Sequence, residues 1–168
     1  MQGVVRQINI SKGGVPKFPV AEAWVTPLGI EGDVQADRVH HGGPRRAVLL
    51  ASLEDIEILR GEGFPIEAGS LGENLTIGGL DFRQLRAGQR FYVGGALIEL
   101  TKPRTPCSKL DVYNSAPGLQ IQERIFDERA RAGDPTSPVW GMAGFYAAVV
   151  RAGPIATGVT IALADQAV

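Results

Sequence analysis

Two aspartates and two adjacent histidines gather in one short segment of the chain. The segment reads Gly32-Asp33-x-x-x-Asp37-x-x-His40-His41-Gly42-Gly43-Pro44. Asp and His are the natural proton carriers and metal ligands of proteins, and the glycines let backbone N–H groups approach a ligand closely. Adjacent histidines on a strand point to opposite faces, so a shared ion requires a loop here. The alternative is a polar turn in which one His caps backbone carbonyls.

The only cysteine lies between cations and prolines, in Lys102-Pro103-Arg104-Thr105-Pro106-Cys107-Ser108-Lys109. Arg104 and Lys109 favour the thiolate, which is the nucleophilic and metal-binding form of Cys107. The two prolines restrict the loop and suit a thiolate held in fixed geometry. The alternative, a buried Cys acting as a small apolar side chain, fits these flanking charges less well.

Two further segments carry polar or glycine-rich patterns. In Gly69-Ser70-Leu71-Gly72-Glu73-Asn74-Leu75, the carboxylate and the amide are able to bind a polar ligand. They are equally suited to fixing a tight turn, because Asn tolerates unusual backbone angles. The segment Trp140-Gly141-Met142-Ala143-Gly144-Phe145-Tyr146 is interpreted as core and turn rather than as a site. The glycine-rich phosphate-binding motifs and the GxSxG nucleophile elbow are absent.

Composition excludes several classes of protein. One Cys in 168 residues cannot form an internal disulfide, and one Cys with two His cannot supply a zinc finger. The formal charge of −1 argues against a nucleic-acid partner. There is no signal-peptide core and no apolar run long enough to cross a membrane, so we expect a cytoplasmic protein without a membrane partner.

Short alternating strands dominate the predicted elements. We expect strands at 4–10, 21–25, 46–51, 75–77, 89–93, 97–101, 145–152 and from 162 onward. Gly94-Gly95 predicts a hairpin, Ser52 with Asp55 predicts a helix start before Leu53, and a second helix is expected over 119–131. The pattern predicts one domain over 1–168, mainly β with a few helices (α+β), forming a closed or nearly closed β-barrel. An open α+β sheet is the alternative.

The order of these segments resembles the MOSC domain, the C-terminal domain of molybdenum cofactor sulfurase. The matching blocks are GD-x-x-x-D-x-x-HHGG, GEN-L, PR-x-PC-x-KL, the G-F-Y strand and a G-x-x-x-x-G ending, spread over about residues 4–164. The resemblance implies a β-barrel that binds the molybdenum cofactor, a pterin dithiolene with a terminal phosphate. It also implies that Cys107 ligates molybdenum or carries sulfur.

The resemblance extends to the residues around this cysteine. Molybdenum is soft enough to accept a thiolate ligand together with the dithiolene sulfurs of the cofactor. Asp37 with His40 or His41 would move protons at the metal and, with Cys107, make up the expected catalytic set. The expected cofactor-binding residues, through phosphate-neutralising cations or hydrogen bonds to the pterin, are Gly42, Gly43, Arg45, Arg46, Glu73, Asn74, Lys102 and Arg104.

Two functions agree with the resemblance. The first is a molybdoenzyme that reduces N-hydroxylated compounds, such as N-hydroxylamino base analogues, to amines. The sequence contains no flavin or iron–sulfur motif, so electrons would come from a separate reductase. The second is a sulfur-carrier or cofactor-delivery module that uses a Cys107 persulfide.

Overall fold

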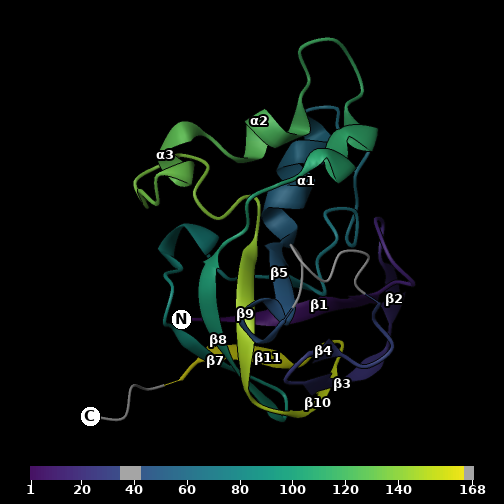
Figure 1. Ribbon diagram of the computed structural model, residues 1–168, viewed down its shortest axis with the longest axis vertical. Coiled ribbons are helices and arrows are strands. Elements are labelled where there is room, and N and C mark those ends of the chain that lie inside the picture. The colour runs from purple at the N-terminus through teal and green to yellow at the C-terminus, as the bar shows by residue number, and fades with distance from the viewer. Residues whose placement is uncertain (35–42, 165–168) are drawn as a thin grey trace.

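A closed ring of strands forms the centre of the molecule. The computed structural model describes residues 1–34 and 43–164. In order around the ring lie β1 (Gln2–Ile10), β11 (Thr160–Leu163), β7 (Arg90–Val93), β8 (Ala96–Pro103), β9 (Phe145–Arg151), β5 (Val48–Ser52) and β6 (Leu75–Gly78). Because β1 pairs with both β6 and β11, the sheet closes into a barrel (Figure 1). The predicted barrel is confirmed, and the alternative of an open sheet is wrong.

Shorter strands extend the barrel on one side. β2 (Phe18–Val20) pairs with the end of β1, and β10 (Gly153–Ala156), β3 (Glu22–Thr26) and β4 (Gly29–Ile30) form a small second sheet. The strands expected at 145–152 and from 162 onward leave out residues 153–156, so β10 was not predicted. Pro154 pairs with Trp24 at the edge of the small sheet, where a missing N–H is tolerated.

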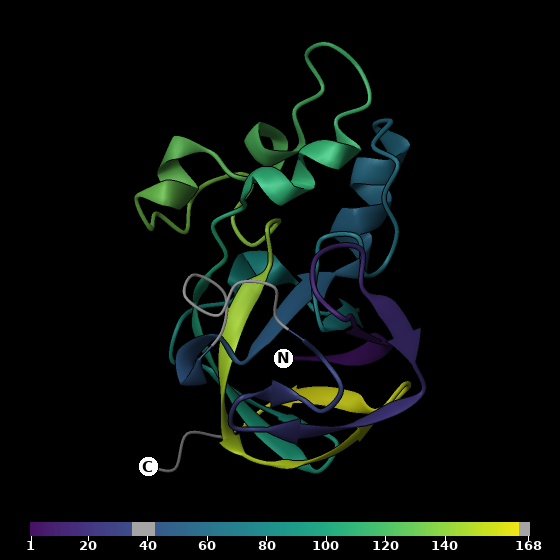
Figure 2. The ribbon, with the colours of Figure 1, turned by 45° about the vertical axis from the view of Figure 1, so that its right-hand side comes forward.

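The helices gather at one end of the barrel (Figures 1 and 2). They are α1 (Leu53–Gly61), α2 (Ile121–Ile125), α3 (Glu128–Arg131) and the 3-10 turn η3 (Ser108–Tyr113). Two further 3-10 turns, η1 (Pro44–Arg46) and η2 (Phe82–Gln84), lie beside the barrel strands. The Ser52 hydroxyl accepts a hydrogen bond from the Asp55 N–H at 3.1 Å, so the predicted start of α1 is confirmed.

The single helix expected over 119–131 is wrong, because the segment divides into α2 and α3. Phe126 is extended (φ −153°) and places its ring in the core. The Asp127 carboxylate then accepts the Ala130 N–H at 2.7 Å and caps the second helix. A capping side chain in mid-segment therefore overrides the helical spacing.

The predicted Gly94-Gly95 hairpin between β7 and β8 is confirmed, and its glycines serve a second purpose. Gly94 adopts a positive φ of 54°. A Cβ atom at Gly94 would lie 2.8 Å from the Pro154 carbonyl oxygen, and one at Gly95 would lie 2.7 Å from the Pro154 ring. The hairpin can therefore pack directly under β10 only with glycine at both positions.

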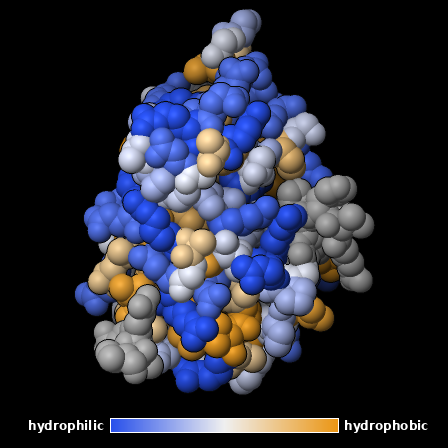
Figure 3. All heavy atoms as spheres, turned by 60° about the vertical axis from the view of Figure 1, so that its left-hand side comes forward, coloured by the Kyte–Doolittle hydropathy of each residue, from blue (hydrophilic) through white to orange (hydrophobic). Residues whose placement is uncertain are grey.

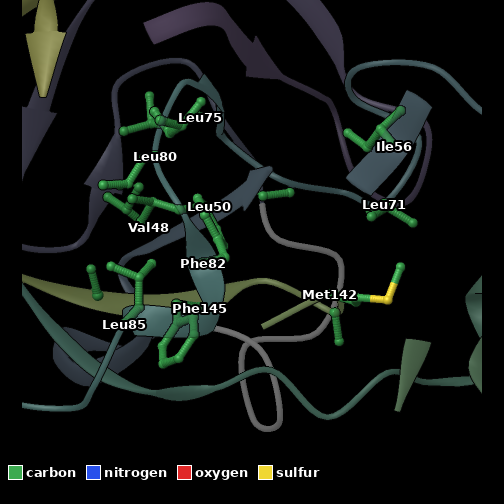
Figure 4. Close-up of a cluster of buried hydrophobic side chains, with 14 of the residues drawn as sticks. Val48, Leu50, Ile56, Leu71, Leu75, Leu80, Phe82, Leu85, Met142 and Phe145 are labelled. Carbon is green, nitrogen blue, oxygen red and sulfur yellow. The ribbon is translucent and has the colours of Figure 1, made fainter. Parts of the chain in front are cut away.

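The barrel interior is filled by branched aliphatic and aromatic side chains. Figure 4 shows Phe82 and Phe145 packed near Val48 and Leu50 of β5. The Phe145 ring lies edge-to-face against Phe82 at 6.4 Å and against Trp140 at 5.9 Å between centroids. Phe145 opens β9, so this packing fixes the start of that strand.

Gly144, immediately before β9, permits the closest approach in this region. Its φ is 92°, and a Cβ there would lie 2.4 Å from the Leu50 carbonyl oxygen. Its own carbonyl accepts the Arg104 N–H at 2.8 Å. One glycine thus joins β5, β9 and the segment that follows β8.

A buried ion pair anchors the segment that leads out of the small sheet. The Lys17 ammonium binds the Asp33 carboxylate, and both side chains are at most one-tenth exposed. Asp33 also accepts the Ser11 N–H at 2.8 Å and the Asn74 side-chain N–H at 2.8 Å. Asn74 accepts the Leu49 N–H at 3.1 Å in turn. Asp33 is therefore tied to β5 and β6.

The surface drawn in Figure 3 is mostly hydrophilic, and its apolar residues gather mainly at the end of the barrel away from the helices. Within the described ranges, no helix has the length and apolar character needed to cross a membrane.

We predict that Gly144→Ala lowers the free energy of unfolding by roughly 2–5 kcal/mol, because it combines an unfavourable backbone conformation with overlap against Leu50. Gly133→Ala is the matched control, since its φ is 79° and a Cβ there would meet nothing within 4 Å. Denaturant titration measures both. Equal losses for the two variants would show that the backbone approach at Gly144 is unimportant.

Lys17→Met should cost about 3 kcal/mol of stability, because it leaves the buried Asp33 carboxylate without its cation. Glu99→Gln breaks the exposed Arg90–Glu99 pair and should cost less than about 1 kcal/mol. The same denaturant titration compares them, and a Lys17 variant as mild as the Glu99 variant would contradict the anchoring role.

Candidate functional site

Cys107 directly precedes η3, at the end of the loop that follows β8. This loop leads from the barrel to the helices (Figure 2). Cys107 is partly exposed and has extended backbone angles (φ −129°, ψ 169°). Its carbonyl accepts the Leu110 N–H at 3.1 Å, which begins the η3 turn. The bond between the Arg104 N–H and Gly144 holds the other end of the loop against β9. The thiol is thus presented from a loop that is fixed at both ends.

Arg104, three residues before this cysteine, is buried, although arginine usually lies at the surface. Only 4% of the Arg104 surface is exposed to solvent. Its Nε and Nη1 atoms are buried and have no hydrogen-bond partner within residues 1–34 and 43–164. Buried donors of this kind carry a desolvation cost that an anionic or polar ligand would offset.

Tyr146 lies near Cys107 and Arg104 as well, although the sequence pattern did not mark it as a site residue. The residue lies on β9 opposite Lys102 of β8, and the Arg46 guanidinium stacks over its ring at 5.8 Å from the centroid. The pKa of the Tyr146 phenol is raised above its usual value, mainly because the residue is buried. The charges of Arg104 and Arg46 lower this pKa, and the charge of Cys107 raises it. Tyr146 therefore lies within electrostatic reach of all three side chains.

Strand alternation is the signal that would have found Tyr146. The G-F-Y segment was interpreted as core and turn, which holds for Trp140 and Phe145, both at most 4% exposed. In a strand, neighbouring side chains point to opposite faces. Phe145 enters the core, so Tyr146 lies on the other face of β9, with the cations.

The expected phosphate-binding cations come together only in part. Partial burial and the charge of Arg46 lower the pKa of Lys102, so these two cations lie near each other. Arg45 is exposed, and its carbonyl accepts the Thr101 hydroxyl at 2.7 Å. Arg46, Lys102 and Arg104 thus form a cationic group around Tyr146, with Arg45 at its outer edge.

Glu73 is fully buried, which the sequence pattern did not reveal. One carboxylate oxygen accepts the Gly69 N–H at 2.6 Å and the Thr76 hydroxyl at 2.7 Å. The other oxygen, Oε2, is buried and has no partner in the described part of the chain. Burial raises the Glu73 pKa, and these hydrogen bonds and the charge of Arg104 lower it by smaller amounts.

The remaining expected site residues fall into two groups. The Asn74 amide is engaged within the fold, with Leu49 and Asp33. Gly43 is exposed and directly precedes η1 with a φ of 79°. Asp37, His40, His41 and Gly42 lie outside the described residues. Among the residues described, no group of three or more His, Cys, Asp or Glu side chains is placed to hold a metal ion.

Comparisons with known proteins identify the family of this chain. The family model "MOSC domain" matches residues 37–162. YflK of Bacillus subtilis (strain 168) is 32% identical over 157 residues, which is 91% of this chain and 64% of that protein. YiiM of Escherichia coli (strain K12) is 39% identical over 97 residues, which is 55% of this chain and 43% of that protein. The chain therefore spans less than two thirds of the length of these curated relatives.

A solved structure confirms the relationship at the level of the fold. The crystal structure of YiiM from Geobacillus stearothermophilus superposes with a TM-score of 0.72 at 25% identity, covering 99% of this chain and 77% of that one. The matched region of the family model contains the barrel strands from β5 to β9 and the loop of Cys107. The chain belongs to the MOSC domain family.

Proposed function

We propose that this chain binds the molybdenum cofactor at Cys107 and reduces N-hydroxylated compounds to amines. MOSC domains are associated with this cofactor. The observation that carries the proposal is a partly exposed Cys107 thiol that lies three residues after Arg104, a buried guanidinium whose Nε and Nη1 have no hydrogen-bond partner among residues 1–34 and 43–164. A soft thiolate donor next to an anion-binding group fits a metal dithiolene that carries a phosphate.

The residues divide the binding task by their chemistry. Cys107 would supply the thiolate ligand to molybdenum. Arg104 offers Nε and Nη1 to an oxyanion, and Arg46 and Lys102 add positive charge around Tyr146. A guanidinium suits a phosphate because its donors form a fixed fork. Glu73 would hold a polar group from inside, and Asn74 would act by fixing the loop of Asp33.

The proposed reduction requires that electrons and protons reach the same site. When bound, the cofactor supplies a centre that accepts electrons and takes up the substrate oxygen. Asp37, His40 and His41 are the expected proton donors. Pro103 and Pro106 restrict the loop that carries Cys107, and so would hold the thiolate in a fixed position. We propose that a separate reductase in the cytoplasm supplies the electrons.

The first test measures metal and pterin in the purified protein. Protein from a cofactor-competent host should contain about one molybdenum per chain and release a pterin on denaturation. Cys107→Ala should lose most of the molybdenum, and the exposed neighbour Ser108→Ala should retain it. Wild-type protein with a cyanide-labile sulfur and no molybdenum would instead show the alternative function, a sulfur carrier with a Cys107 persulfide.

A second test concerns the two histidines. His40→Ala or His41→Ala should lower turnover on the order of 10²-fold, or lower molybdenum content, with little change in melting temperature. Calorimetry and metal analysis on the same samples separate the two effects. If both variants only lower the melting temperature, the histidines are part of a structural turn.

A further inference from the structure

An extra residue in β8 interrupts the pairing with β9 just before the loop that carries the thiol. Leu100 of β8 lies opposite Ala147 of β9. Two residues further on, Lys102 lies opposite Tyr146, which is only one residue back along β9. Thr101 is therefore the additional residue of a β-bulge. Bulges are common beside active sites, where they redirect side chains.

The bulge decides which way Lys102 faces. In a regular strand, Lys102 would share the face of Leu100, which is fully buried in the core. The extra residue shifts the alternation by one, and such a shift turns a side chain to the opposite face of the sheet. Lys102 is exposed and pairs with Tyr146, whose neighbour Phe145 enters the core. Without the bulge, Lys102 would point into the barrel.

The Thr101 hydroxyl fastens this bulge to η1. Its Oγ1 atom lies 2.7 Å from the Arg45 carbonyl oxygen and 3.2 Å from the Tyr146 carbonyl oxygen. A hydroxyl has one proton to donate, so the two carbonyls share one donor. Three segments, η1, β8 and β9, therefore meet at a single side-chain oxygen.

The same contact places Arg46. The turn η1 has only three residues, and Arg46, its last, directly follows the carbonyl that Thr101 binds. The Arg46 guanidinium lies over the Tyr146 ring at 5.8 Å from the centroid, and η1 packs against β9. A cation is attracted to an aromatic ring only when it lies over the face of that ring. Thr101 is thus connected to Arg46 through η1 and to Lys102 through the bulge.

We propose that Thr101 is a positioning residue that sets Arg46 and Lys102 at the spacing at which they bind a phosphate group. The proposal deepens the proposed function and rests on it for the identity of the anion, the terminal phosphate of the cofactor. The two cations repel each other, so the fold must hold them together until a phosphate offsets the repulsion. The Thr101 hydroxyl joins the segments that carry them.

The first test observes Arg46 without any ligand. In the wild-type protein, nuclear Overhauser effects should connect the Arg46 side chain to the Tyr146 ring. Thr101→Val keeps the branched shape but removes the hydroxyl, and Thr101→Ala removes it without adding a methyl group. Both should lose these signals, whereas Thr101→Ser should retain them. Arg151 lies over the Tyr92 ring at 5.6 Å, and this pair should be unchanged in every variant.

Binding of inorganic phosphate to the full chain without cofactor gives the second readout. We expect a dissociation constant on the order of 1 mM for the wild type and on the order of 10-fold weaker binding for Thr101→Val. Thr101→Ser should stay within about 3-fold of the wild type. Thr160→Val, at an exposed threonine on β11, is the matched control and should bind like the wild type. In an Arg46→Gln background, Thr101→Val should weaken binding by a smaller factor, because one of the groups that it positions is gone.

These measurements separate positioning from a purely structural role. An unchanged contact between Arg46 and Tyr146 in Thr101→Val would overturn the proposal, and so would unchanged phosphate affinity with only a lower melting temperature. Equal losses of affinity with and without Arg46→Gln would also contradict it. A wild type that binds no phosphate would refute the anion site of the proposed function, and the signals between Arg46 and Tyr146 would then still decide whether Thr101 positions Arg46.

Discussion

The contact between the Gly144 backbone and β5 sets the geometry of everything around Cys107. Because no side chain stands between them, β9 begins where the Leu50 carbonyl permits it. Phe145 then enters the core, Tyr146 turns to the opposite face, and the Gly144 carbonyl receives the Arg104 N–H. A guanidinium is thereby held inside the protein by its own backbone, three residues before the thiol. The electrostatics of the site follow from one position that must be glycine.

The buried polar groups also affect the stability of the folded protein. Desolvated donors and acceptors without partners destabilise a folded chain. The large apolar core around Phe82 and Phe145 provides the stability against which such groups are tolerated. A ligand that satisfies Arg104 would therefore stabilise the folded state as well as bind to it. Active sites commonly combine local instability with a rigid frame in this way.

Local sequence signals predicted the elements that are determined by residues close together in the sequence. The alternation in 4–10 predicted β1, Gly94-Gly95 predicted the hairpin, and Ser52 with Asp55 predicted the start of α1. The prediction failed where a tertiary contact decides. Pro154 is accepted in β10 only because the small sheet ends there, and Phe126 leaves the helical path to reach the core.

The candidate site was likewise predictable from the sequence only where local chemistry decides. Cys107 and its flanking cations were recognisable from their spacing, because charge and loop chemistry are local properties. The burial of Arg104 and Glu73 was not, since it depends on the packing of β8, β9 and η3 around them. Tyr146 was missed because its partners come from two distant segments. The register of β8 and β9 places Lys102 opposite it, and the packing of η1 against β9 brings Arg46 over its ring.

The pairing of β1 with β11 brings the first and last strands of the ring side by side. Gln2 lies opposite Ala162, and the Leu163 N–H donates to the Met1 carbonyl at 2.9 Å, so the first and last strands are neighbours in the ring. A short linker between them would leave every strand pairing intact, and new ends opened in a surface turn such as that of Gly133 would interrupt no strand. The topology is thus suited to circular permutation.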